Sequence, residues 1–256
     1  MSYFEQWKAY GLDCLHRDQG SSSRLRILSQ DDATITLSSS FVLTTSHSAL
    51  HPLRIPCEFI YTIHLNGHIT VTTHVDLPHD MPPPPRIGLR TILSSAVGQH
   101  VNWFGYGPHE AYDDRKSCVA LGFYSKSIEQ LHVPYVVPQE SGRRHDPRWI
   151  ELVDTNRDLK KTKGLRIIID RREDQTPDSP LSWGWSMSRY SLETLESTRH
   201  NHELEEDHHQ GIHLHVDRAM MGLGGYDSWS PNVDSKYLIA TGCRWKFSMT
   251  FAPFER

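Results

Sequence analysis

Long apolar runs, paired cysteines and a one-sided charge are all missing from this 256-residue chain. No stretch approaches the ~20 consecutive apolar residues that a membrane helix needs. The first residues, MSYFEQWKAYGLDCLHRD, lack the basic region and apolar segment of a secretory signal. With 27 basic and 31 acidic residues the formal net charge is −4, so neither nucleic acid nor an anionic membrane is indicated as a partner. We therefore expect a cytoplasmic protein.

The cysteine spacing excludes two further classes of site. Cys14, Cys57, Cys118 and Cys243 are widely separated, and no CxxC pair occurs. This spacing argues against a cysteine-bound zinc ion and against a thioredoxin-like motif. We expect free thiols, as is usual in a reducing cytosol, and no metal or other cofactor.

Short runs rich in β-branched and aromatic residues indicate an all-β protein. Within 68–77 (HITVTTHVDL), Ile69, Val71 and Thr73 share one face, and the preceding LNGH at 65–68 predicts a hairpin turn. The runs are 33–45, 57–65, 68–77, 101–107, 165–170, 181–190, 212–217 and 245–251. They predict a large antiparallel β-sandwich formed by one domain over residues 1–256.

Three other segments are interpreted as connections or helix. HDMPPPPRIG at 79–88 is a stiff connector that is excluded from strand interiors; it suits a domain boundary, but we interpret it as a loop within one sandwich. RREDQTPDSP at 171–180 predicts a solvated loop. One short helix is predicted within 191–206, with Ser191 as its N-cap and Leu192 and Leu195 facing inward.

A tryptophan lies on an unusual loop near the C-terminus, MGLGGYDSWSPNV at 221–233. Gly224 and Gly225 permit backbone angles that other residues avoid, and Pro231 prevents a helix. Trp229 therefore lies on a loop. Two interpretations stay open: the ring anchors the loop in a core, or it is held out for a ligand.

Several motifs, in a fixed order, resemble one family. They are VNWFGYGPHEAYDDR (101–115), VPYVVPQESGRR (133–144), SMSRYSLETL (186–195) and MGLGGYDSWSP (221–231), with FEQWKAYG (4–11) and RIGLR (86–90) also fitting. This order resembles the C-terminal "small chain" domain of bacterial-type β-galactosidases of glycoside hydrolase family 2. The resemblance spans nearly the whole chain. It implies a β-sandwich of the galactose-mutarotase-like kind, a supersandwich.

The resemblance implies sugar recognition rather than hydrolysis. In the family, the catalytic glutamate pair lies in a separate (β/α)₈ barrel, which needs about 250 residues of its own. No acid here matches those two glutamates, which suggests a barrel-bearing subunit as partner. In the family the tryptophan of this loop packs against the sugar, so the resemblance implies that role for Trp229. Asp227 either accepts hydrogen bonds from sugar hydroxyls or braces the loop. Ser228, between Asp227 and Trp229, is a further ligand-binding candidate.

Two polar constellations provide further candidates. A dense group of polar residues accompanies the aromatic strand predicted at 101–107. It forms either the rim of a ligand-binding cleft or a loop held by salt bridges. Its members are Tyr106, His109, Glu110, Tyr112 and Arg115. His109 and Glu110 offer a base and an acid near neutral pH. In PQESGRR, Glu140 either pairs with Arg144 as a buried brace or lines a pocket, where it serves as an acid or base. Arg144 is also a ligand-binding candidate, because a guanidinium can bind a carboxylate of a ligand as well as one of the protein.

The histidines form a third group, namely His200, His202, His208, His209, His213 and His215. On a strand, His213 and His215 share a face, which is compatible with two metal ligands. The alternation I-H-L-H-V more simply places apolar residues inward and histidines outward. We predict no metal, and we include His200 among the ligand-binding candidates.

The sequence supports two alternative hypotheses for the function of the protein. The first is a non-hydrolytic module that recognises galactosides, alone or with a barrel-bearing subunit. The alternative is a stand-alone isomerase, lyase or cyclase acting on a small molecule. Its proton-transfer residues would come from His109, Glu110, Glu140 and Asp227, and His109 is one of the departures from the family pattern GPQENYPDR.

Overall fold

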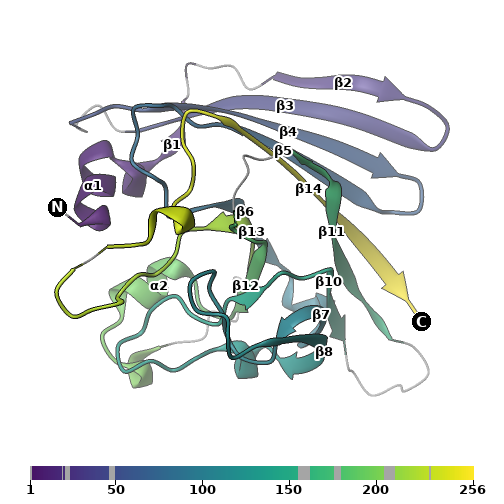
Figure 1. Ribbon diagram of the computed structural model, residues 1–256. Coiled ribbons are helices and arrows are strands. Elements are labelled where there is room, and N and C mark those ends of the chain that lie inside the picture. The colour runs from purple at the N-terminus through teal and green to yellow at the C-terminus, as the bar shows by residue number, and fades with distance from the viewer. Residues whose placement is uncertain are drawn as a thin grey trace. The chain divides into compact units, whose positions relative to one another are not determined.

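The chain forms two compact units in the computed structural model (Figure 1). The structure describes residues 2–18, 20, 24–45, 50–154, 162–175, 180–204, 211–230 and 232–256. The first unit comprises Met1–Arg86, Ile169–Leu181 and Met221–Ala252, and the second comprises Ile87–Ile168, Ser182–Met220 and Pro253–Arg256. The first crossing from one unit to the other falls at Arg86–Ile87, at the start of β6 and directly after the prolines of the predicted connector. One domain over residues 1–256 stays a prediction.

An antiparallel sheet forms most of the first unit. Its strands are β1 (His16–Arg17), β2 (Arg24–Gln30), β3 (Thr34–Thr44), β4 (Arg54–His64), β5 (Ile69–Asp76) and β14 (Arg244–Glu255). The order is β1-β3-β4-β5-β14, with β2 paired to β3. The predicted turn connects β4 to β5: Gly67 has φ +80°, and the amide of His64 donates to the carbonyl of His68 at 2.9 Å.

Alternation along β5 explains the core of this sheet. Val71 and Thr73 are buried on the predicted face, and the register places them opposite Met249 and Phe247 of β14. Each apolar side chain of that size stabilises the fold by about 1.5–3 kcal/mol when buried. The alternation of side chains with a period of two therefore predicts both that this segment is a strand and which of its faces packs against the core.

Two layers of strands form most of the second unit. Their strands are β6 (Arg86–Leu93), β7 (His100–Gly107), β8 (Ala120–Ser127), β9 (Arg144–His145), β10 (Trp149–Asp154), β11 (Lys163–Gln175), β12 (Gly184–Ser188) and β13 (Ile212–Met220), of which β11 belongs to this unit only as far as Ile168. In one layer β11, β10, β7 and β8 are hydrogen-bonded in that order, and the other is a four-stranded sheet with the order β6-β13-β12-β9. The rings of Trp103 on β7 and Trp185 on β12, both fully buried, meet edge to face at 5.4 Å between centroids. These tryptophans join the two layers.

The helices are short. They are α1 (Tyr3–Tyr10) and α2 (Leu192–Ser197), and the 3₁₀ turns are η1 (Leu12–Cys14), η2 (Ser95–Val97), η3 (Glu129–Leu131), η4 (Asn201–Glu203) and η5 (Ser235–Tyr237). Ser191 caps α2 as predicted, by accepting from the Thr194 amide at 2.9 Å. Within the described ranges, no helix is both long and apolar enough to span a membrane.

The eight predicted strands all coincide with observed ones, so the all-β antiparallel class is confirmed. Two expectations need correction. The predicted loop at 171–180 is wrong over its first half, because β11 continues to Gln175 with Arg171 and Arg172 exposed; 176–179 lie outside the described residues. Helix α1 was not predicted, although Ser2 and Glu5 form a reciprocal capping box there.

Candidate functional site

The Trp229 loop, residues 221–230, belongs to the first unit and is fixed at its start. The amide of Met221 donates to the carbonyl of Pro85 at 2.9 Å, and the amide of Gly222 donates to the carbonyl of Tyr237 at 3.0 Å. Gly224 is left-handed at φ +69°, and a Cβ there would lie 2.6 Å from the carbonyl oxygen of Asn232. Only glycine fits such a close approach, so the chain turns sharply just before Trp229.

Asp227 shapes the tip of this loop. Its Oδ1 accepts from the amides of Trp229 at 2.8 Å and Ser230 at 2.6 Å, and its Oδ2 accepts from the Ser230 hydroxyl at 3.1 Å. These bonds, led by the Ser230 amide, lower the pKa of the Asp227 carboxyl. The carboxylate is therefore ionised at neutral pH and braces the turn that carries the indole.

The Trp229 side chain points into solvent. It is 91% exposed, and its loop neighbours Leu223 and Tyr226 are exposed as well. The described residues thus give this indole no core to occupy. Ser228 is also exposed. A large apolar ring on a braced turn is available to a ligand or to another protein surface.

Glu110 is an acceptor for three donors in the second unit. Its carboxylate accepts from the Gly142 amide at 2.7 Å, from the Tyr112 hydroxyl at 3.3 Å and from the Tyr135 hydroxyl. Burial, followed by the charge of Glu110, raises the pKa of Tyr112. The bond to Glu110 is the main reason that the pKa of Tyr135 is raised. Glu110 therefore joins two loop segments.

Arg144 is buried to 1% exposure and donates to main-chain carbonyls. Its Nη1 donates to Leu131 at 2.8 Å and to Gly142, and its Nη2 donates to Pro108 at 3.4 Å. Burial lowers the pKa of its guanidinium to about 10. These carbonyls, rather than Glu140, are the partners of the Arg144 guanidinium. Arg144 holds this loop region together from inside.

A buried cluster of charged side chains is centred on Asp113, which follows β7 in the sequence. Asp113 accepts from Nε2 of His145 at 2.9 Å and from the amide of Ser182 at 3.0 Å, and Nη2 of Arg143 lies 3.6 Å away. The Tyr106 ring meets the His145 ring edge-on at 5.9 Å. Asp113 is a departure from the family pattern GPQENYPDR, and its buried carboxylate links the segments that carry His145 and Ser182.

The remaining sequence candidates lie at the surface. His109 and Arg115 are exposed, and Arg115 closes a tight turn with Tyr112 through two main-chain bonds of 3.2 and 2.8 Å. The His200 ring is also exposed; its Nδ1 lies 3.1 Å from a Glu203 oxygen, and it stacks on His202 at 5.5 Å.

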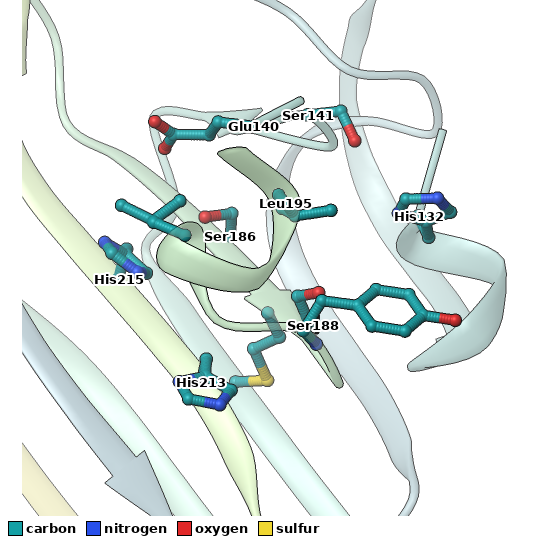
Figure 2. A pocket seen from close by; sticks show the side chains of 11 residues that line it. His132, Glu140, Ser141, Ser186, Ser188, Leu195, His213 and His215 are labelled. Carbon is teal, nitrogen blue, oxygen red and sulfur yellow. Dashed lines mark hydrogen bonds between the residues drawn. The ribbon is translucent and has the colours of Figure 1, made fainter. Parts of the chain in front are cut away.

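A small cavity in the second unit gathers residue types that carry acid–base chemistry (Figure 2). Glu140 and Ser141 line it from a loop, Ser186 and Ser188 from β12, His213 and His215 from β13, His132 from the end of η3, and Leu195 from α2. Burial lowers the pKa of His132. Of these lining residues, Glu140 was predicted as a site residue, whereas no motif in the sequence marks Ser141, Ser186, Ser188 or His132.

His213 and His215 correct the expectation that they face outward. They share one face of β13, as predicted, but both are buried. The cavity lining places Leu192 and Leu195 of α2 beside them, so the helix covers that face. His208 and His209 lie outside the described residues. Among the residues that the structure describes, no group of three His, Cys, Asp or Glu side chains could hold a metal ion.

The size of this cavity decides what it can hold. It offers about 20 Å³ to a water molecule, close to the ~15 Å³ that one water needs. Sites for small organic ligands are typically ~300–1,000 Å³. The cavity therefore has room for a bound water and is too small for a sugar ring. His109 does not line it.

The fold and the loop define a class: an antiparallel β protein that presents a braced indole. The chain belongs to the β-galactosidase small-chain family, because the family profile described as "Beta galactosidase small chain" matches residues 1–251. A β-galactosidase of Pseudoalteromonas haloplanktis is 34% identical over 187 residues, 73% of this chain and 16% of that protein. One of Vibrio cholerae is 30% identical over 240 residues, 93% of this chain and 20% of that protein. The chain thus spans a fifth or less of the length of these curated relatives.

Similarity to solved structures is weaker. A GalM/aldose epimerase homologue from C. elegans has 11% identity and a TM-score of 0.38 over 90% of this chain and 68% of its own. Galactose 1-epimerase from Lactobacillus acidophilus has 10% identity and a TM-score of 0.39 over 91% of this chain and 66% of its own. Scores of this size do not add to the assignment.

Proposed function

We propose that this chain is a galactoside-recognising module that contributes Trp229 to a sugar site completed by a larger, barrel-bearing β-galactosidase subunit or domain. The observation that carries the proposal is the 91% exposure of the indole on a loop whose backbone is braced. A pyranose presents an apolar face of C–H groups that can stack on such a ring.

The proposed module does not cleave glycosides itself. Retaining glycosidases need two carboxyl groups about 5 Å apart across the sugar. Asp227, the acid nearest to Trp229 in the loop, is occupied by three hydrogen bonds that hold the turn. The catalytic carboxylates would then come from the partner, which agrees with the share of the relatives' length that this chain represents.

The stand-alone enzyme alternative has less support. Its candidates Glu110 and Glu140 lie in the second unit, where Glu110 already accepts from three donors and Glu140 faces a space of about 20 Å³. Proton transfer to a small molecule requires that the molecule reach within ~3 Å of the base. A cavity for one water does not permit that approach.

Calorimetry tests the proposal directly. The full chain is titrated with lactose and with a thiogalactoside, alone and after mixing with a barrel-bearing β-galactosidase chain from the same organism. We expect heat of sugar binding in the mixture, and a loss of at least tenfold in affinity for Trp229→Ala, as for a buried aromatic hot spot. Tyr237→Ala, an aromatic truncation outside the loop, is the control. Equal affinity of Trp229→Ala and wild type, or no heat in either setting, would overturn the proposal.

A further inference from the structure

A second hollow in the molecule is unlike the water-sized cavity. It lies on the sheet of the first unit and has an open volume of about 360 Å³. Its principal lining residues come from four neighbouring strands: Val42 from β3, Pro56 and Glu58 from β4, His74 and Asp76 from β5, and Arg244 from β14. This volume lies at the lower end of the ~300–1,000 Å³ range of small-molecule sites.

The strand register brings these side chains to one face. Glu58 lies directly opposite His74, and Asp76 lies directly opposite Arg244. Val42 pairs with Pro56, which lies two residues along β4 from Glu58. Because residues two apart in a strand project to the same side, the two rungs form one continuous floor. Charged groups occupy one part of this floor, and the apolar Val42–Pro56 pair occupies another.

Both carboxylates in the groove are ionised and oriented. Glu58 accepts from the Ser38 hydroxyl at 2.6 Å and lies 3.2 Å from Nδ1 of His74; the bond from Ser38 is the main reason that its pKa is lowered. Asp76 receives Nε and Nη2 of Arg244 at 2.6 and 2.8 Å, and its pKa is lowered chiefly by that bond. A bidentate pair of this kind fixes the planes of both the carboxylate and the guanidinium.

We propose that this groove, the Glu58 groove, binds a neutral polyhydroxylated molecule of monosaccharide to disaccharide size. Carboxylate oxygens and a guanidinium supply acceptors and donors in one hollow, which matches hydroxyl groups that do both. Arg244 offsets one of the two negative charges of Glu58 and Asp76, so one net negative charge remains and the groove disfavours an anionic ligand. Val42 and Pro56 offer an apolar wall to C–H groups. The site is additional to Trp229 and does not depend on a partner chain.

The test follows amide chemical shifts of the full chain during titration with lactose, D-galactose and myo-inositol. We expect saturable shifts centred on Glu58, His74 and Asp76. Glu58→Gln should weaken this binding about tenfold, as expected when a hydrogen bond to a charged group is lost. Thr62→Val, on the same face of β4 but outside the groove, should leave it unchanged. Glucuronate serves as an anionic probe and should bind less well than the neutral ones.

Other outcomes have defined meanings. Trp229→Ala should preserve binding in the Glu58 groove. A loss of sugar binding at Trp229 and a loss of binding in the groove can therefore be told apart. If Glu58→Gln does not fold, as judged by circular dichroism, Arg244→Gln takes its place, because that pair is exposed. Shifts that vanish in Trp229→Ala, shifts that Glu58→Gln and Arg244→Gln leave unchanged, or a clear preference for the anionic probe would overturn the inference.

Discussion

The Trp229 loop and the His213–His215 cavity both contain residues that the sequence singles out, and the two regions differ sharply in the space around those residues. The cavity collects histidines, a glutamate and serines, yet it has room for about one water. The loop has one carboxylate, which is used to brace the turn, and an indole that is fully presented to solvent. Accessible space, rather than the number of reactive side chains, separates a recognition surface from a packed interior.

The largest expected effect comes from enlarging the cavity. Leu195→Ala removes a buried side chain of α2, and the loss of apolar contact together with the space left behind should lower the free energy of unfolding by about 2–4 kcal/mol. The matched control is Leu223→Ala in the Trp229 loop, where the leucine is exposed and the change should stay within about 0.5 kcal/mol. Urea denaturation measures both. Equal effects would show that the two leucines are packed alike and would remove the contrast.

An intermediate effect is expected at the brace of the loop. Asp227→Ala removes the acceptor for the Trp229 and Ser230 amides, so the indole loses its fixed position and the affinity of the mixed complex for lactose should fall about fivefold. Asp227→Asn keeps an oxygen acceptor and should restore most of the affinity. The titration described above measures this. An asparagine variant as weak as the alanine variant would instead assign the carboxylate a direct contact with the sugar.

The smallest effect concerns pH and the helix that covers the cavity. Arg90 donates to Glu193 of α2 at 2.6 and 2.7 Å, and this bond is the main reason that the pKa of Glu193 is lowered to about 2. A lowered pKa contributes stability above the unfolded value near 4.5, and that contribution is lost as the pH falls from about 4.5 to about 2. Because Glu193 is 68% exposed, solvent screening keeps the contribution below about 1 kcal/mol.

Comparing wild type with Glu193→Gln checks this sign. The melting temperature of the variant should lie slightly below that of wild type at pH 7, and the two should converge near pH 2. A gap that widens as the pH falls would contradict the assignment. Glu255→Gln, which removes an exposed acid outside α2, is the control for the change in net charge.

Much of the β framework was predictable because local rules decide it. The alternation around Val71, the turn at Gly67 and the cap at Ser191 each depend on residues close together in the chain, and each appears where the sequence places it. The missed helix α1 had its signal as well, since a serine followed three residues later by a glutamate indicates a capping box. Local rules failed at β11, where the exposed residues Arg171 and Arg172 still form a strand.

The candidate site was only partly predictable. That Asp227 would brace a turn follows from its neighbours in sequence, and the bonds to Trp229 and Ser230 are of that kind. The partners of Arg144 did not follow, because Leu131 and Pro108 reach it only after the loops have packed. Neither did the burial of His213, because it depends on α2 covering a face of β13 that alternation alone assigns to solvent.

The sequence by itself determined the strand class, the turn chemistry around Gly67 and Gly224, and membership of the β-galactosidase small-chain family through motifs in fixed order. Only the tertiary structure decided which side chains are accessible. It exposes Trp229, closes the histidine cavity to about one water and opens the groove beside Glu58. The reason is physical: propensity and alternation act over a few neighbouring residues, whereas the space around a side chain depends on segments that are distant in the chain.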